Sequence, residues 1–210
     1  MITKIKYTKR TKHTDYLEVE INPNQLALEN EYKKHIFEDE ILKKTESYKN
    51  GKLTGGKIYL RSSEDLEDII TQYNNSYEDW AFSYDNEVSR DFKYSETVTY
   101  LKGTLKFKFR EVANNKLIAY QSLDIVTNDV LRTLKYYYDE IYGDEDVSYQ
   151  LIKVTYGSGG EVENINSFLD PDEVYKLSDY LEQEDLMAVF NWNEHPYYHK
   201  AEPLIPNGDL

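Results

Sequence analysis

Residues 191–200 carry the side chains best suited to chemistry. The segment reads NWNEHPYYHK and holds two of the chain's four histidines, four residues apart, with a glutamate beside the first. Histidines at that spacing on a helix can share one metal ion, and Glu194 would add a carboxylate ligand. Pro196 opposes this geometry, because a proline disfavours helical backbone at the preceding residue, His195. A metal site formed by Glu194, His195 and His199 is therefore the weaker of two interpretations.

The aromatic residues of the same segment favour a structural role. Phe190, Trp192, Tyr197 and Tyr198 can close a hydrophobic core behind the last helix, since such rings bury a large apolar area. Residues 200–210 contain two prolines, and we expect them to form an extended tail. The segment then forms a packed terminus with an aromatic recognition edge. A small-ligand or metal-binding enzyme that uses residues 191–199 is the alternative.

Other catalytic patterns are absent from the sequence. The glycine-rich segment 157–160 (GSGG) approaches a nucleophile elbow at Ser158, but it lies between two predicted strands and lacks the strand-to-helix setting. It also lacks the lysine of a phosphate-binding loop. The chain has no cysteine, which excludes thiol catalysis and thiolate metal sites. We therefore predict no catalytic residues and no cofactor.

The charge of the chain narrows the class of partner. The net charge is −14, and residues 61–210 hold 30 of the 39 acidic residues but only 13 of the 25 basic ones. Such a field repels nucleic acid and anionic membranes and attracts basic proteins. We expect no direct binding to nucleic acid or to membranes. Solubility alone is the alternative explanation of the charge.

The first residues bear on the compartment. The segment MITKIKYTKRTK carries charge but no apolar run, so we expect no signal peptide, and no stretch reaches the length of a membrane span. A chain without cysteine is compatible with a reducing compartment. These features predict a cytoplasmic protein.

Four segments with alternating apolar and polar residues surround turn signals, which predicts four β-hairpins. Their turns fall near residues 12, 50, 114 and 158. Asn50-Gly51 is the strongest signal, because a type I′ turn needs positive φ at both central residues. Gly55-Gly56 predicts a bulge or a bend in the strand that follows.

A predicted helix follows each hairpin. The four helices cover residues 22–37, 62–74, 127–143 and 170–181. In the third, Tyr136 faces away from the apolar stripe. In the fourth, Asp170-Pro171-Asp172-Glu173 matches an N-terminal cap with proline at the first helical position.

These elements predict an α+β fold class: an antiparallel sheet built from about four β-hairpins, with helices packed on one face. We expect a single α+β domain over residues 1–210. Residues 76–95 would form an irregular insertion in the second hairpin–helix pair.

The acidic clusters differ in their position relative to the predicted helices. Residues 63–68 and 170–174 would lie at helix N-termini, where carboxylates complement the helix dipole. Asp144, Glu145 and Asp146 would follow a helix C-terminus, where acids are disfavoured, so we interpret them as an exposed acidic loop. The 21 tyrosines suit an interface, because tyrosine offers a large and rigid ring; codon bias is the alternative.

The leading hypothesis is an acidic binding protein that neutralises a basic protein partner by occlusion. By analogy of charge and composition it would act as an immunity protein does against a toxin such as a nuclease. A mimic of DNA that inhibits a nucleic-acid enzyme is a further alternative. The predicted partner-binding residues are Asp144, Glu145, Asp146, Tyr136, Glu78, Asp79, Trp80 and Tyr84.

Overall fold

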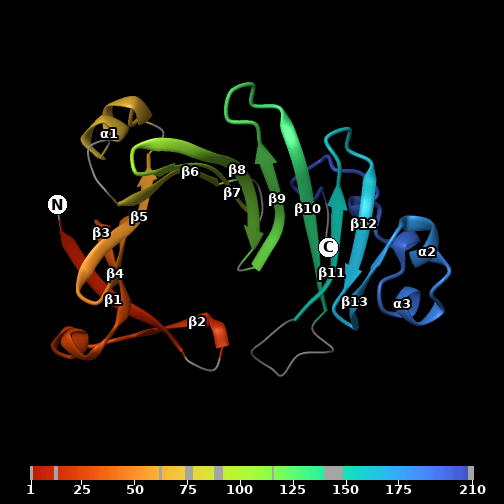
Figure 1. Ribbon diagram of the computed structural model, residues 1–210, viewed down its shortest axis with the longest axis horizontal. Helices are drawn as coiled ribbons and strands as arrows, with labels where there is room; N and C mark the ends of the chain where they lie inside the picture. Colours follow the sequence, from red (N-terminus) through yellow and green to blue (C-terminus); the bar gives the residue numbers. More distant parts are fainter. Residues whose placement is uncertain are drawn as a thin grey trace. The chain divides into compact units, whose positions relative to one another are not determined.

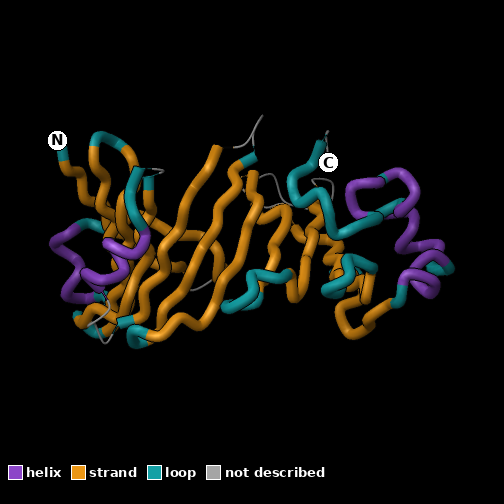
Figure 2. Tube along the Cα trace, turned by 90° about the horizontal axis from the view of Figure 1, so that it is seen from above, coloured by secondary structure: helices purple, strands orange, loops and turns teal. Residues whose placement is uncertain are grey.

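The computed structural model describes residues 2–11, 14–61, 63–73, 78–87, 92–114, 116–139 and 149–207. Strands predominate among them (Figures 1 and 2). Thirteen strands follow the hydrogen-bonded order β13-β12-β11-β10-β9-β8-β7-β6-β5-β4-β3-β1-β2. Strands β5 and β6 are parallel, whereas β1–β2, β3–β4 and β8–β9 are examples of antiparallel pairs. The predicted α+β fold, with helices on one face of four hairpins, is therefore wrong, because the protein is largely a mixed β-sheet with a few short helices.

The chain divides into two compact units. Unit 1 comprises Met1–Asp85 and Thr97–Phe107, and unit 2 comprises Asn86–Glu96 and Lys108–Leu210. A single domain over residues 1–210 stays a prediction. None of the described helices is long and apolar enough to cross a membrane.

Unit 1 contains most of the N-terminal strands and one α-helix. Its elements are β1 (Thr3–Thr11), β2 (Thr14–Glu20), the 3-10 helix η1 (Pro23–Leu28), β3 (Glu31–Glu38), β4 (Ile41–Lys49), β5 (Lys52–Leu60), α1 (Leu66–Tyr73) and the greater part of β6 (Asp79–Glu87). Three strands have residues in both units: β6, β7 (Lys93–Leu101) and β8 (Thr104–Asn114).

Unit 2 contains the remaining strands and two short helices. Its elements are β9 (Lys116–Leu123), β10 (Val130–Asp139), β11 (Tyr149–Tyr156), β12 (Val162–Ser167), β13 (Asp170–Tyr175), α2 (Leu177–Leu181), α3 (Glu184–Val189) and the 3-10 helices η2 (Trp192–Glu194) and η3 (Pro196–Tyr198).

The hairpins that the turn signals predict are present. Strands β4 and β5 pair across Asn50 and Gly51, whose φ angles of 50° and 72° both lie in the left-handed region. Strands β11 and β12 flank the turn over residues 157–161. Strands β8–β9 and β1–β2 also pair, but the predicted turns between them, near residues 114 and 12, include residues outside the described ones. A further turn at Lys102 and Gly103, with φ angles of 49° and 72°, joins β7 to β8 and was not predicted. The turns at Asn50-Gly51 and over residues 157–161 depend on local backbone preference, which their asparagine and glycine residues display directly in the sequence.

Helix α1 matches the predicted helix over residues 62–74, although it is shorter. It connects the parallel strands β5 and β6, a connection that needs a crossover rather than a tight turn. Its predicted apolar stripe packs against the buried side chains of those two strands. The stripe consists of Leu66, Ile69, Ile70 and Tyr73, and the buried side chains are Ile58, Leu60, Trp80 and Phe82.

Three predicted helices are wrong. Residues 22–37 form η1 followed by strand β3, residues 127–143 contain strand β10, and residues 170–181 contain strand β13 followed by the five-residue helix α2. In β10, valine, threonine and three successive tyrosines favour extended backbone, and β9 and β11 pair with the strand on its two sides. The described part of residues 76–95, where an irregular insertion is predicted, contains β6 and the start of β7.

The core of unit 2 lies between strands β11 and β12 and the helical C-terminal region. Val154, Tyr156 and Ile165 contribute from the strands, and Tyr180 and Phe190 contribute from α2 and the end of α3; all five are fully buried. Trp192 and Tyr198 belong to the same cluster. The prediction that residues 190–198 close a core is therefore confirmed.

Candidate functional site

The predicted partner-binding residues of unit 1 lie at the start and along β6. Trp80 is only 3% exposed and packs in the cluster beneath α1, so it is a core residue and not a surface anchor. Tyr84 is half-buried, and its hydroxyl donates a hydrogen bond to the carbonyl oxygen of Glu64 at 3.1 Å. Glu78 is half-buried and Asp79 is exposed. The alternation of a strand explains why Trp80 and Asp79 face different surroundings.

Tyr136 lies in unit 2, on β10, opposite Lys153 of β11. Its ring is half-buried, and burial is the main cause that raises the pKa of its hydroxyl to about 12. Its carbonyl oxygen accepts a hydrogen bond from the Tyr198 hydroxyl at 3.0 Å. The cluster at 144–146 lies outside the described residues. The predicted residues that the structure describes therefore belong to both units, and their role in partner binding stays a prediction.

The two histidines of the 191–200 segment contact different aromatic rings. The His195 ring stacks on Phe190, with centroids 4.7 Å apart and an interplanar angle of 8°. The His199 ring stacks on Trp192 at 5.2 Å, and its Nε2 atom lies 2.8 Å from the Trp192 carbonyl oxygen. Among the described residues, no group of three or more histidine, aspartate or glutamate side chains is placed to hold a metal.

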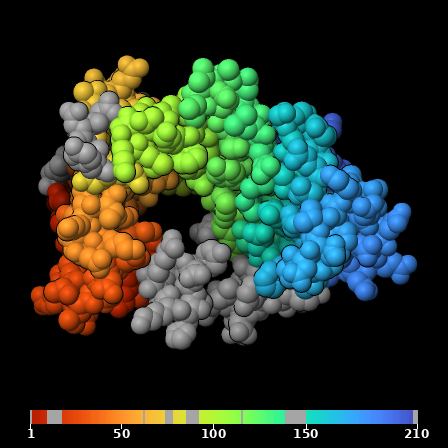
Figure 3. Space-filling model, viewed as in Figure 1, coloured from red at the N-terminus to blue at the C-terminus, as the bar shows by residue number. Residues whose placement is uncertain are grey.

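Exposed acidic side chains are concentrated in residues 161–194 of unit 2, which we call the acidic surface. This stretch contains ten acidic residues and a single basic residue, Lys176. The acidic residues are Glu161, Glu163, Asp170, Asp172, Glu173, Asp179, Glu182, Glu184, Asp185 and Glu194. Eight of the ten are exposed, whereas Glu163 and Asp170 are half-buried. Figure 3 shows this part of the chain at the surface, in blue.

Within the described part of the chain, none of these ten carboxylates forms an ion pair. Unit 1 differs, because lysines on its strands pair with glutamates on neighbouring strands, as Lys49 does with Glu31 and Lys34 with Glu46. The negative field of the acidic surface is therefore not neutralised locally, which suits it to attract cations and basic side chains.

Four large apolar side chains accompany the acidic surface. Phe168 and Leu169 occupy the turn between β12 and β13, Val174 lies on β13, and Leu181 ends α2; they are 59%, 45%, 60% and 42% exposed. Helix α2 packs against β12 and β13 (Figure 1). Exposed apolar side chains surrounded by charge are typical of protein-binding surfaces.

The edge strand β13 occupies the start of the helix that was predicted over residues 170–181. Asp170-Pro171-Asp172-Glu173 resembles a helix cap, but these residues lie in β13, which pairs with β12 at Ser167↔Asp170 and Ile165↔Tyr175. A proline and carboxylates on an edge strand hinder pairing with another strand. Asp170, Asp172 and Glu173 therefore do not cap the N-terminus of a helix.

A cavity of about 270 Å³, with a lining that is both polar and apolar, lies in unit 1 among strands β1 to β5. Its charged and aromatic lining comes from Lys9, Lys33, Glu18, Glu31, Tyr32 and Tyr48. Thr8, Ser47 and Thr54 add hydroxyl groups. The rings of Tyr32 and Tyr48 stack nearly parallel, with centroids 4.9 Å apart and an interplanar angle of 7°.

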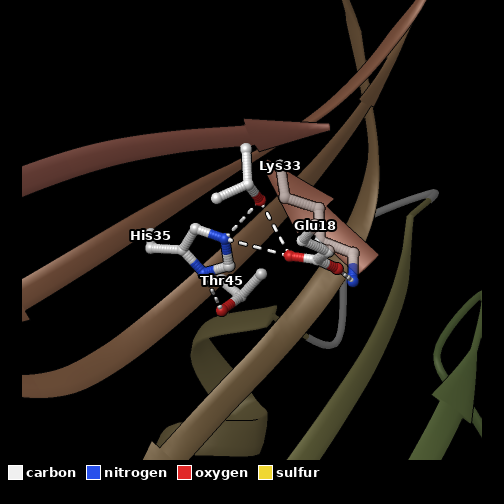
Figure 4. Close-up of polar contacts among 5 residues, drawn as sticks. Glu18, Lys33, His35 and Thr45 are labelled. Atoms are coloured by element: carbon white, nitrogen blue, oxygen red, sulfur yellow. Dashed lines mark hydrogen bonds and ion pairs between the residues drawn. The ribbon is translucent and has the colours of Figure 1, made fainter. Parts of the chain in front are cut away.

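One side of the cavity continues into a hydrogen-bond network around His35 (Figure 4). The Thr8 hydroxyl lies 2.8 Å from Glu18 Oε2 and 2.8 Å from His35 Nε2. Lys33 Nζ pairs with the other carboxylate oxygen of Glu18, and His35 Nδ1 lies 3.1 Å from the Thr45 hydroxyl. Because a hydroxyl has one proton and the carboxylate has none, Thr8 donates to Glu18 and His35 Nε2–H donates to Thr8.

The ionisation states in this network follow from burial and charge. Burial lowers the pKa of His35, and the nearby Glu18 carboxylate opposes that shift. Burial raises the pKa of Glu18, but hydrogen bonds from Lys33 and Thr8 outweigh it and hold the pKa below its ordinary value. The network therefore contains a neutral histidine and an ionised glutamate at neutral pH.

No family model matches the sequence, and neither a curated protein nor a solved structure is significantly similar to it.

Proposed function

We propose that this protein binds a basic protein partner through the acidic surface of residues 161–194. The observation that carries the proposal is the combination of ten carboxylates without a described ion pair and four exposed apolar side chains. Unpaired carboxylates steer a basic partner toward the surface and match its lysines and arginines. Desolvated apolar side chains supply the affinity that exposed charges do not.

The activity would be neutralisation by occlusion, as in an immunity protein that covers a basic toxin such as a nuclease. The carboxylates would occupy the place of the phosphates that such an enzyme binds. An inhibitor of another nucleic-acid enzyme would use the same chemistry with a different partner. The cytoplasm, where such targets lie, is the compartment that goes with this proposal.

An enzyme that uses residues 191–199 has less support. Trp192 and Tyr198 are buried in the core of unit 2, and the hydroxyls of Tyr197 and Tyr198 donate to carbonyl oxygens of the chain itself. These rings and hydroxyl groups therefore already contact other parts of the chain.

The test is affinity capture from an extract of the native host at low salt, followed by stepwise salt elution and mass spectrometry. The variant Asp172→Lys/Glu173→Lys reverses two charges on β13, and Glu40→Lys/Glu67→Lys reverses two exposed charges in unit 1. We expect one basic protein, bound in a fixed ratio and released by salt, with the wild type and the unit 1 variant but not with the β13 variant.

The apolar contribution needs its own variant. Val174→Thr keeps strand propensity while removing an exposed methyl group, and it should weaken capture without changing its salt dependence. Equal capture by all variants, with each still folded, would reject the acidic surface as the binding site.

A further inference from the structure

The cavity of unit 1 has the dimensions of a small-ligand site. Pockets for drug-sized ligands span ~300–1,000 Å³, so a cavity of about 270 Å³ suits a molecule with a single ring. Its lining combines hydroxyl groups, ionised side chains and the stacked rings of Tyr32 and Tyr48. This composition differs from the mostly apolar lining of a typical cofactor pocket.

The charged groups of the cavity are paired with one another or with immediate neighbours. Lys33 pairs with Glu18, Lys9 with Glu29, and Glu31 with Lys49. An ionic ligand would have to break one of these pairs to gain another. A neutral ligand can instead form hydrogen bonds with the ammonium and carboxylate groups while the ion pairs stay intact. Hydrogen bonds to charged groups are stronger than those between neutral groups.

The tyrosines define one wall of the cavity. Burial, followed by the hydrogen bond to Glu46, raises the pKa of Tyr48 to about 12, so its hydroxyl stays protonated and donates to Glu46 at 3.0 Å. That bond fixes Tyr48, and the Tyr32 ring stacks on it. Rigid aromatic rings beside fixed polar groups suit a ligand with one apolar face and polar edges.

From this geometry we infer that the cavity between β1 and β5 binds a neutral, polyhydroxylated ring, namely a neutral pyranose sugar. The inference is independent of the acidic surface in unit 2. The sugar hydroxyls contact the Lys33–Glu18 pair and the hydroxyls of Ser47 and Thr54, and its C–H face lies on the tyrosine wall. Because Glu18 belongs to both the cavity and the His35 network, binding changes the environment of His35.

The test is a titration of the isotope-labelled full-length protein followed by amide and imidazole NMR signals. The probes are glucose, galactose and mannose, their methyl glycosides, and the charged analogues glucuronate and glucosamine. We expect a neutral sugar to shift the amide signals of Thr8, Lys33 and Ser47 and the imidazole signal of His35, and to bind more tightly than its charged analogues. A methyl glycoside that binds as well as the free sugar indicates recognition of a terminal glycan residue, and weaker binding indicates the free sugar.

Two variants separate binding at this site from binding elsewhere. Thr54 is exposed at the cavity, and Thr54→Trp fills it, whereas Thr104→Trp places the same ring at an exposed position of β8. We expect the first to weaken sugar binding by at least about tenfold and the second to leave it unchanged. Ser47→Leu serves as a second filling variant if Thr54→Trp loses the dispersed spectrum of unit 1.

The inference is overturned if no neutral sugar moves these signals, if the charged analogues bind as tightly as the neutral ones, or if both folded filling variants bind like the wild type.

Discussion

The Nζ atom of Lys135 lies 3.7 Å from the centroid of the Tyr197 ring and donates a hydrogen bond to the carbonyl oxygen of the same residue at 2.7 Å. The carbonyls of Lys200 and Pro203 accept further hydrogen bonds from this amine, at 2.8 and 2.9 Å. Lys135 is fully buried on β10. The Lys135 side chain thus binds three backbone carbonyl oxygens of the C-terminal segment.

The charge state of Lys135 reflects two opposing effects. Burial lowers its pKa to about 7, and the Glu202 carboxylate opposes the shift. Three carbonyl acceptors need three N–H donors, and only the charged ammonium has three. The hydrogen-bond geometry therefore corresponds to the protonated form.

Removing this ammonium should destabilise unit 2. Lys135→Met leaves three carbonyl acceptors without their donor, at a cost of ~1–3 kcal/mol for each buried group, so we expect the free energy of unfolding to fall by about 3 kcal/mol or more. Urea denaturation measures this change. Lys153→Met, on the neighbouring strand, is the matched control and should cost less than ~1 kcal/mol. Equal losses in the two variants would show that the tail contacts contribute nothing specific.

Unfolding at high pH should follow from the buried tyrosines. Burial raises the pKa of Tyr156, Tyr180, Tyr197 and Tyr198, whose hydroxyls all donate to backbone carbonyls. Because the folded-state pKa exceeds the unfolded value near 10, these tyrosines favour folding below pH 10, and that stability is lost as the pH rises further.

Tyrosinate absorbance and circular dichroism, recorded together, measure this effect. We expect an exposed class of tyrosines that ionises near pH 10 and a buried class that ionises only as the fold is lost. A single class near pH 10 with an unchanged dichroism spectrum would contradict the prediction.

Two histidines should titrate below the ordinary value of 6.5. Burial lowers the pKa of both His35 and His195, while Glu18 and Glu194 respectively oppose the shifts. Since the folded-state pKa lies below the unfolded one, both histidines favour folding above pH 6.5, and that contribution is lost as the pH falls.

NMR titration of the imidazole signals separates the two sites. Glu18→Gln should lower the pKa of His35 further and leave His195 unchanged, and Glu194→Gln should do the reverse. A rise of the His35 pKa in Glu18→Gln would refute the placement of that carboxylate beside the imidazole.

Close packing of strands at Gly56 should make this position intolerant of a side chain. A Cβ atom there would lie 2.1 Å from the carbonyl oxygen of Thr45, in the neighbouring strand. We expect Gly56→Ala to cost more than ~4 kcal/mol, because backbone cannot move aside cheaply. Gly51→Ala meets no atom within 4 Å, and only its φ of +72° is unfavourable, so it should cost about 1 kcal/mol. Thermal melting followed by circular dichroism compares the two variants, and similar melting temperatures would rule out the close approach.

The turns and one helix could be predicted from sequence because their determinants are local. Asn50-Gly51 favours positive φ at both positions and adopts it here, and the apolar stripe of α1 packs on the strands that the helix connects. Lys102-Gly103 forms the same kind of turn, but lysine does not signal positive φ, so this turn was missed.

Strand β10 shows where local pattern fails. Its apolar residues, Val130, Leu131, Leu134, Tyr137 and Tyr138, fit the period of a helix, while the residues that the strand buries most are Thr133 and Lys135. The spacing of apolar residues predicts secondary structure only if the apolar residues are the buried ones, and in β10 two of the buried residues are polar. Hydrogen bonds to β9 and β11 stabilise the extended conformation of this segment. The sequence of the segment alone does not show that these two strands will pair with it.

The sequence by itself determined the acidity of residues 61–210, the Asn50-Gly51 turn, helix α1 and the packed aromatic terminus, because each depends on composition or on neighbours along the chain. Only the tertiary structure decided that Asp170–Tyr175 is an exposed edge strand, that Trp80 is buried, and that Lys135 meets carbonyls more than sixty residues away. The physical reason is that strand pairing and the satisfaction of buried polar groups join distant segments. Their partners are chosen by the fold as a whole and not by any one stretch of residues.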